Sequence, residues 1–298
     1  MEVDVEAIGR VVSGVATFSL MLIMLSMGLA LEAADFLRVL RRPRAAVLGL
    51  FGQLLLLPVV AFGLAHLLDL DPILAIGLMV LAACPGGATS NAISVMARGD
   101  AALSVSLTAV SSFVAFLTAP FVIGLALEQF QVDGRSLSIP FVESSLQIFG
   151  STVLPVVLGM FLRDRAIWLR TRRRQIFNVG LTLVLTCSGI LLLGRFTLLD
   201  SGQAALAAVA LNVVMMALAW AMARALLDDE AATRSITIEV GLQNVSLALV
   251  IIVSFLDVLE ALAPTLFYLP CAYVTGFGFA WLVRRRSADE PEGTRTAT

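Results

Sequence analysis

The stretch CPGGATSNAIS, residues 84–94, interrupts one of the most apolar parts of the chain. Proline and glycine break helices, and Thr89, Ser90 and Asn91 follow them directly with polar side chains. In a bilayer, irregular backbone persists only where protein buries it or where it lines a water-filled cavity, because each unsatisfied polar group costs several kcal/mol. If this part of the chain lies in a membrane, the stretch predicts either a functional site or a kink whose backbone is satisfied locally.

The amino-acid composition indicates that the chain lies in a membrane. The chain has 298 residues, of which 59% are hydrophobic and 14% charged, whereas soluble domains carry about 25% charged residues. So much apolar surface requires lipid as a solvent. The net charge of −2 gives no reason to expect a nucleic-acid partner, and the three widely spaced cysteines fit no metal or disulfide pattern.

Nine apolar segments have the length that crosses a bilayer, about 20 residues each. They cover residues 11–31, 45–67, 73–96, 102–127, 141–162, 176–194, 203–225, 235–256 and 264–283. The loops between them are short, which favours antiparallel neighbours. The predicted fold class is therefore an all-α polytopic membrane protein with about nine transmembrane helices.

The arginines predict its orientation. With the N-terminus outside, the inner side receives 17 arginines and the outer side 3, as the positive-inside rule requires. Residues 1–10 are then extracellular and 284–298 form a cytoplasmic tail, in a cell membrane that we expect to be a bacterial inner membrane. The acidic leader MEVDVEAIGR argues against a signal peptide.

A second break lies in ITIEVGLQNVSLALVII, residues 236–252. A carboxylate such as Glu239 is costly inside a membrane, about 2.5–3.5 kcal/mol for Asp at a helix centre, and usually marks a functional site. Pairing with Arg234 at the interface is the alternative. The two breaks occupy the third and eighth segments, five helices apart, which predicts two inverted repeats. Interrupted helices in corresponding places of such repeats point to a transporter's binding site.

Polar side chains in neighbouring segments support this interpretation. Ser104 and Thr108 are four residues apart and share a helical face, as do Glu239 and Gln243, and Gln53 is a lone amide in an apolar segment. Singly, such residues often bond to their own backbone or join helices. Together with Asn91 they form a set of oxygen donors with one negative charge, which suits a hard cation such as sodium.

At these residues the chain resembles the bile acid:sodium symporter family. The resemblance is carried by CPGGATSNAISVMARGDAALSVSLTAVSS, residues 84–112, and by IEVGLQNVSLAL, residues 238–249, and extends from about residue 20 to 283. It implies a transporter domain, residues 11–283, in which two discontinuous helices cross. A panel of helices, about residues 11–31, 141–162 and 176–194, would face a core domain, about residues 45–127 and 203–283.

The resemblance also implies two sodium ions as coupling ions. One would be held by Ser90, Asn91, Ser104, Thr108 and Glu239, and the other by Gln53, Glu239 and Gln243 with the carbonyls of Val240 and Leu242. Thr89, Asn91 and Asn244 would contact the substrate. The implied function is sodium-coupled import of a small organic anion (bile acid-like, keto acid or pantoate-like) by alternating access, in a monomer. Ala88 stands where bacterial relatives often carry Thr, which leaves the substrate open.

Three alternatives remain at this point. A proton-coupled carrier would use Glu239 alone and would not need the neutral oxygen donors. A channel or receptor would tolerate the same breaks but needs a pore lining or a signalling domain. An enzyme needs a catalytic constellation, and the single histidine, His66, has no evident catalytic partner.

Overall fold

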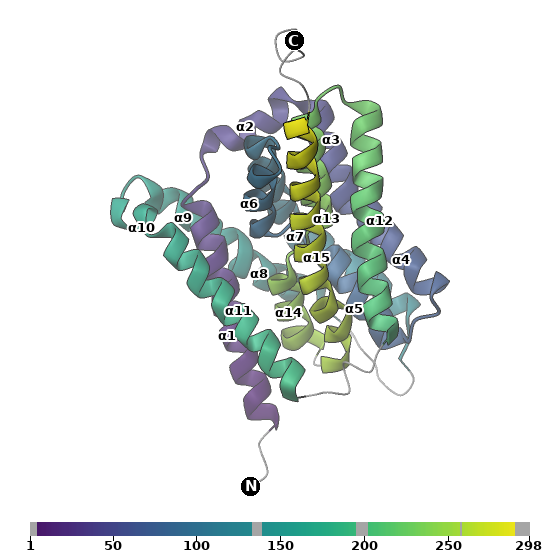
Figure 1. Ribbon diagram of the computed structural model, residues 1–298. Coiled ribbons are helices and arrows are strands. Elements are labelled where there is room, and N and C mark those ends of the chain that lie inside the picture. The colour runs from purple at the N-terminus through teal and green to yellow at the C-terminus, as the bar shows by residue number, and fades with distance from the viewer. Residues whose placement is uncertain (1–4, 133–138, 195–201, 257, 290–298) are drawn as a thin grey trace.

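The computed structural model describes residues 5–132, 139–194, 202–256 and 258–289, and within these ranges its regular secondary structure consists of helices joined by short non-helical segments (Figure 1). The first half contains α1 (Val5–Gly28), α2 (Ala33–Arg41), α3 (Pro43–Phe51), α4 (Leu57–Leu67), α5 (Pro72–Ala83), α6 (Ala88–Met96) and α7 (Ala101–Gln129). The second contains α8 (Phe141–Ile148), α9 (Leu154–Arg163), α10 (Ile167–Thr171), α11 (Arg173–Gly194), α12 (Gly202–Leu226), α13 (Glu230–Gly241), α14 (Val245–Ile251) and α15 (Ala263–Asp289).

Among the described residues, five helical stretches are long and apolar enough to cross a membrane. They are Pro43–Leu67, Ala101–Gln129, Phe141–Arg163, Gly202–Leu226 and Leu259–Arg285. Shorter apolar helices cover Ser13–Gly28, Pro72–Ala83 and Val245–Leu256. The prediction of a polytopic all-α membrane protein is confirmed at this level. The segments 73–96 and 235–256 are each split into two helices, as their sequences indicated.

Local sequence explains several helix ends. Asp71 accepts a hydrogen bond from Ile73 N at the start of α5, and Pro72 occupies the first position, where its missing N–H has no helical partner to lose. Two wide π-helical turns, Gly52–Leu56 and Phe149–Val153, precede Pro58 and Pro155. A proline cannot donate to the carbonyl one turn earlier, and the wider turn accommodates that loss without ending the helix.

Helices α1, α9 and α11 pack together along one flank of the molecule (Figure 1). Their contacts are close because glycine occupies them: a Cβ at Gly28 would lie 2.1 Å from Val156 O, and one at Gly159 would lie 2.5 Å from Leu25 O. Small residues bring membrane helices into such contact. The remaining long helices form a larger body that contains both broken segments.

Figure 1 places the start of α1 and the end of α15 at opposite ends of the molecule. The short helix α2 lies near the end where α15 finishes and packs against α7, to which Ser106 Oγ ties it by donating to Asp35 O at 2.7 Å. The sequence of α2 has a low mean hydropathy and a strongly amphipathic pattern, which is typical of a helix lying at a membrane surface.

Candidate functional site

The two helix breaks meet and satisfy each other's backbone. The first lies between Ala83, the end of α5, and Ala88, the start of α6; the second lies between Gly241, the end of α13, and Val245, the start of α14. Gly87 N donates to Leu242 O at 2.8 Å, and Asn244 N donates to Pro85 O at 2.9 Å. Each break thus supplies the polar partners that lipid cannot provide, which explains how bare backbone persists here.

Gly86 allows this approach. It pairs with Gln243 as an isolated antiparallel bridge, and a Cβ at residue 86 would lie 2.2 Å from Glu239 Oε1. Heavy atoms do not approach so closely without displacement. Glycine is therefore required at this position by the carboxylate of the other break, a constraint that acts between residues far apart in sequence.

Three hydroxyl groups donate to the buried carboxylate of Glu239, which is 1% exposed. Ser90 Oγ and Ser104 Oγ donate to Oε2 at 2.7 and 3.2 Å, and Thr108 Oγ1 donates to Oε1 at 2.5 Å. Ser104 and Thr108 also donate to Asn91 Oδ1, at 2.9 and 3.2 Å. The five residues expected for one sodium site therefore gather in one cluster, which draws on α6, α7 and α13.

Two of the three side chains expected for the second sodium site, Gln53 and Gln243, also meet. Gln53 Nε2 donates to Gln243 Oε1 at 2.5 Å and to Cys84 O at 2.9 Å, and Gln243 Nε2 donates to Val240 O at 2.7 Å. The carbonyl of Leu242 is the acceptor for Gly87 N. Gln53 sits in the π-helical turn Gly52–Leu56, a type of turn frequent at functional sites.

The chemistry of these groups fits a hard monovalent cation. The donors are hydroxyl, amide and carbonyl oxygens with a single carboxylate, whereas no group of three or more His, Cys, Asp or Glu side chains is found in the part of the chain that the structure describes. Gln53 Oε1 is buried and has no hydrogen-bond partner there. A buried acceptor without a donor is costly, and a cation would satisfy it.

Sequence reasoning missed three residues that hold the second break. Asn212 Nδ2 and Tyr268 Oη both donate to Gly241 O, each at 2.7 Å, and Thr275 Oγ1 donates to Asn212 Oδ1 at 2.6 Å. They satisfy the carbonyl that α13 exposes where it ends. A buried amide in the apolar α12 and a fully buried tyrosine in α15 were the available signals, because such groups need partners inside the protein.

Of the residues expected to contact the substrate, Thr89 and Asn244 line a cavity of about 40 Å³ between the crossing and the helices α1 and α11. Asn244 Oδ1 caps α14 by accepting from Leu247 N at 3.1 Å, whereas its Nδ2 is buried without a partner among the described residues. Asn91 is half-buried and its Oδ1 is engaged in the cluster around Glu239. A cavity of this volume has room for a water molecule or two and is too small for an organic anion.

Comparison with known proteins decides the family. The profile of the Sodium Bile acid symporter family matches residues 17–187, more than half of the chain. The chain belongs to this family. The resemblance carried by residues 84–112 is thereby confirmed, and the chain is a membrane transporter rather than an enzyme.

Relatives of the symporter are named for sodium dependence. It is 31% identical to YocS of Bacillus subtilis, an uncharacterized sodium-dependent transporter, over 86% of this chain and 79% of that protein. It is 32% identical to BASS2 of Oryza sativa, a probable chloroplastic sodium/metabolite cotransporter, over 78% of this chain and 54% of that protein. With the human ileal sodium/bile acid cotransporter it shares 34% identity over 52% of this chain and 44% of that protein. The chain thus spans about half the length of the plant and human proteins.

Proposed function

We propose that this family member imports a small organic anion together with two sodium ions by alternating access. The observation that carries the proposal is the convergence of one buried carboxylate, Glu239, with neutral oxygen donors beside the crossing of two broken helices. Bile acid-like compounds, keto acids and pantoate-like acids are the candidate substrates. Of the sodium-dependent relatives, the human protein is named for bile acids and the plant protein for metabolites.

In this proposal Glu239 serves both sodium ions. Ser90, Asn91, Ser104 and Thr108 complete the first site; Gln53, Gln243 and the carbonyls of Val240 and Leu242 complete the second. Gly86 connects the two groups, because it pairs with Gln243 and its α-carbon abuts Glu239 Oε1. A sodium ion would bind the Glu239 carboxylate in place of the hydroxyl hydrogens that now contact it. Gln53 Oε1, which has no hydrogen-bond partner among the described residues, would coordinate a sodium ion.

The net charge of the proposed ion sites favours a substrate with one negative charge. Two sodium ions and one carboxylate leave a local charge of about +1, which a monoanion would neutralise in this low-dielectric setting. Thr89 stands in the first turn of α6, Asn91 lies in the same helix, and Asn244 offers an unused donor from its side-chain amide. These three residues would contact the carboxylate of the substrate. Sodium binding would favour the anion, and by linkage the anion would favour sodium to the same extent.

Access would alternate through movement of the panel, which comprises α1, α8 with α9, and α11, against the body that contains the two helix breaks. The cavity of about 40 Å³ lies at this boundary, lined by Phe177 and Leu181 on one side and by Thr89 and Asn244 on the other. Separation of the two bodies would open it to one side of the membrane. We further propose nine transmembrane spans in two inverted repeats, a monomer, an outside N-terminus and a cytoplasmic C-terminus in the inner membrane.

Uptake into proteoliposomes tests the proposal. Radiolabelled or mass-detected organic anions should accumulate with an inward sodium gradient and should not accumulate when potassium replaces sodium. Two sodium ions with a monoanion move one net positive charge, so an inside-negative potential should stimulate uptake. Electroneutral uptake would contradict this stoichiometry or the monoanion.

Proton-coupled transport is the second candidate, because a buried carboxylate such as Glu239 can carry a proton. It predicts uptake driven by a pH gradient in sodium-free buffer. The three hydroxyl groups around Glu239 and the free Gln53 Oε1 favour sodium, since a proton carrier requires neither.

A further inference from the structure

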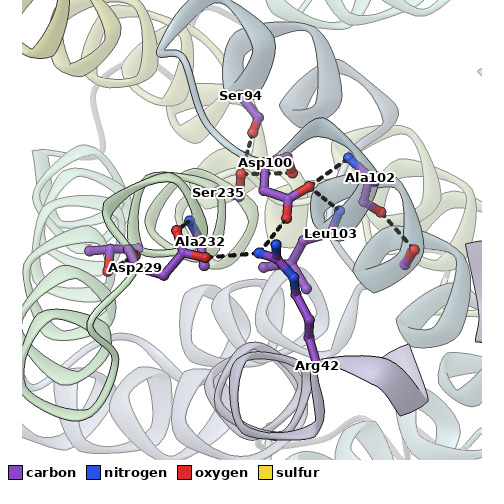
Figure 2. Close-up of polar contacts among 10 residues, drawn as sticks. Arg42, Ser94, Asp100, Ala102, Leu103, Asp229, Ala232 and Ser235 are labelled. Carbon is purple, nitrogen blue, oxygen red and sulfur yellow. Dashed lines mark hydrogen bonds and ion pairs between the residues drawn. The ribbon is translucent and has the colours of Figure 1, made fainter. Parts of the chain in front are cut away.

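A second polar network lies one helical turn from the proposed sodium site, at the end of the molecule where α2 is found (Figure 2). Arg42, between α2 and α3, donates from one nitrogen, Nη1, to two carboxylates. Asp100 Oδ2 accepts at 2.9 Å and Asp229 Oδ2 at 2.8 Å. These aspartates are 129 positions apart in the chain and are brought together at this one arginine.

Each aspartate caps the N-terminus of a helix with its other oxygen. Asp100 Oδ1 accepts from Ala102 N and Leu103 N of α7, both at 3.0 Å, and Asp229 Oδ1 accepts from Ala232 N of α13 at 3.0 Å. Helix caps of this kind fix where a helix begins. Arg42 therefore joins the beginnings of α7 and α13 through their capping groups.

Further bonds leave little freedom at this junction. Asp100 N donates to Ala231 O at 3.0 Å, and Ser235 Oγ donates to Asp100 O at 2.9 Å. Ser94 Oγ of α6 lies 2.7 Å from Ser235 Oγ (Figure 2). A Cβ at Gly99 would lie 2.5 Å from Ser235 Oγ, so the loop between α6 and α7 is packed directly onto the serines.

Three ligands of the proposed sodium site are each one turn away from a member of this network. Ser90 is four residues from Ser94 in α6, and Ser104 in α7 is four residues from the N-cap Asp100, to whose carbonyl its N–H donates at 3.0 Å. Glu239 is four residues from Ser235 in α13. Residues four apart in a helix lie on the same face, so the network sets the relative positions of the three helices that carry the ligands.

We propose that Arg42 is a positioning residue for the sodium site. Its single positive charge offsets part of the negative charge of the two aspartates, and it holds α7 and α13 in the register in which Ser104 and Thr108 reach Glu239. This inference rests on the proposed sodium coupling. Without Arg42, two like charges would face each other at the helix starts and displace one helix relative to the other.

The expected effect is moderate, because the Arg42 side chain is 54% exposed and solvent screens its charge. Mutations that act on a site through intervening structure usually change its ligand affinity only modestly. We therefore expect Arg42→Ala to raise the sodium concentration for half-maximal effect by about three- to tenfold, with near wild-type maximal transport at saturating sodium.

The test is a sodium titration of two readouts on the full chain, uptake in proteoliposomes and thermal stabilisation in detergent. Arg42→Lys should keep most of the wild-type affinity, because a single nitrogen contacts both carboxylates and lysine offers one. Arg42→Ala combined with Asp229→Asn should regain affinity, since it removes the facing charge while asparagine still caps α13. Arg44→Ala is the matched control, an exposed arginine two residues along in α3.

A purely structural role predicts a lower melting temperature for Arg42→Ala without sodium and an unchanged half-maximal sodium concentration. That result would overturn the positioning role. Equal sodium affinities in the Arg42→Ala and Arg44→Ala variants would overturn it too. A wild-type protein that shows no sodium response in either readout would instead contradict the proposed function, and this inference with it.

Discussion

The two helix breaks that cross in this symporter contribute different things to the same site. The first, between α5 and α6, supplies glycine and neutral oxygens, and its Gly86 leaves room for the carboxylate of the other break. The second, between α13 and α14, supplies the negative charge of Glu239 and is held by the donors Asn212 and Tyr268. The room for the carboxylate, provided by Gly86, and the negative charge of Glu239 therefore come from separate segments. A substitution can remove either one without the other.

Removal of the charge should have the largest effect. Glu239→Gln keeps the shape of the side chain and one oxygen but deletes the formal charge that faces both proposed cations. We expect sodium-dependent binding and uptake to be abolished, because Coulomb terms are large in a buried site. Uptake and sodium-dependent thermal stabilisation measure this directly.

Size-exclusion elution and a melting curve without sodium serve as controls that the Glu239→Gln protein folds. An unchanged sodium response in this variant would show that the charge does not bind sodium. Loss of pH dependence alone would identify Glu239 as a proton carrier.

Filling the room that Gly86 leaves beside Glu239 should have the second-largest effect. In Gly86→Ala the new methyl group lies 2.2 Å from Glu239 Oε1, so the crossing must shift. We expect a loss of about 1–3 kcal/mol of stability, the usual cost of overpacking, together with at least a tenfold loss of uptake. Gly63→Ala in α4 is the matched control, since a Cβ there meets nothing within 4 Å. Equal melting temperatures for the two variants would contradict the proposed tight contact.

Loss of one neutral oxygen ligand should have a smaller effect, because it weakens one of the two proposed sodium sites and leaves the charge of Glu239 in place. Thr108→Val keeps the size of the side chain but removes the hydroxyl that donates to Glu239, and Gln53→Ala removes the free buried oxygen. Each should raise the sodium concentration for half-maximal uptake by about three- to tenfold, as expected for the loss of one polar interaction of about 0.7–1.4 kcal/mol. Loss of sodium dependence altogether, or no change in either variant, would be inconsistent with two sites that share Glu239.

The smallest effect is expected from the anchor of the second break. Tyr268→Phe removes one of two donors to Gly241 O and leaves Asn212 in place. We expect a loss of about 1 kcal/mol of stability and less than a threefold change in sodium response. The double variant with Asn212→Ala should lose more than the sum of the single variants, because the carbonyl then has no donor from either side chain. Strict additivity in melting temperature would argue against a shared role.

The sequence predicted both helix breaks and the oxygen-bearing side chains that gather around Glu239, because each leaves a local mark. A long apolar segment indicates a transmembrane helix, and a cluster of polar residues within it indicates a functional site. The role of Gly86 left no such mark: any proline–glycine break contains glycines, and only the fold brings Glu239 against this one. Asn212 and Tyr268 did leave a mark, as polar side chains in apolar helices, but the sequence does not show that their partner is the carbonyl of Gly241 in another segment.

The same limit applies to Arg42. In the sequence it is one of several arginines that flank a membrane segment, and the positive-inside rule alone accounts for it. Its two aspartates lie in loops about 60 and 190 residues away, near helix starts where acidic residues are common. Chain order gives no reason to join the three, and the junction in Figure 2 arises only when α7 and α13 pack against each other.

The pairing of the two breaks through main-chain atoms has a consequence for how such a carrier diversifies. Gly87 N, Leu242 O, Asn244 N and Pro85 O belong to the backbone, so their bonds survive exchange of most neighbouring side chains. Thr89 and other cavity-lining positions can therefore be substituted without breaking the backbone junction beside the proposed ion sites. In the proposed mechanism, substrate specificity and sodium coupling can therefore be changed separately. A library randomised at the residues that line the cavity can be selected for uptake of a chosen acid under one fixed sodium gradient.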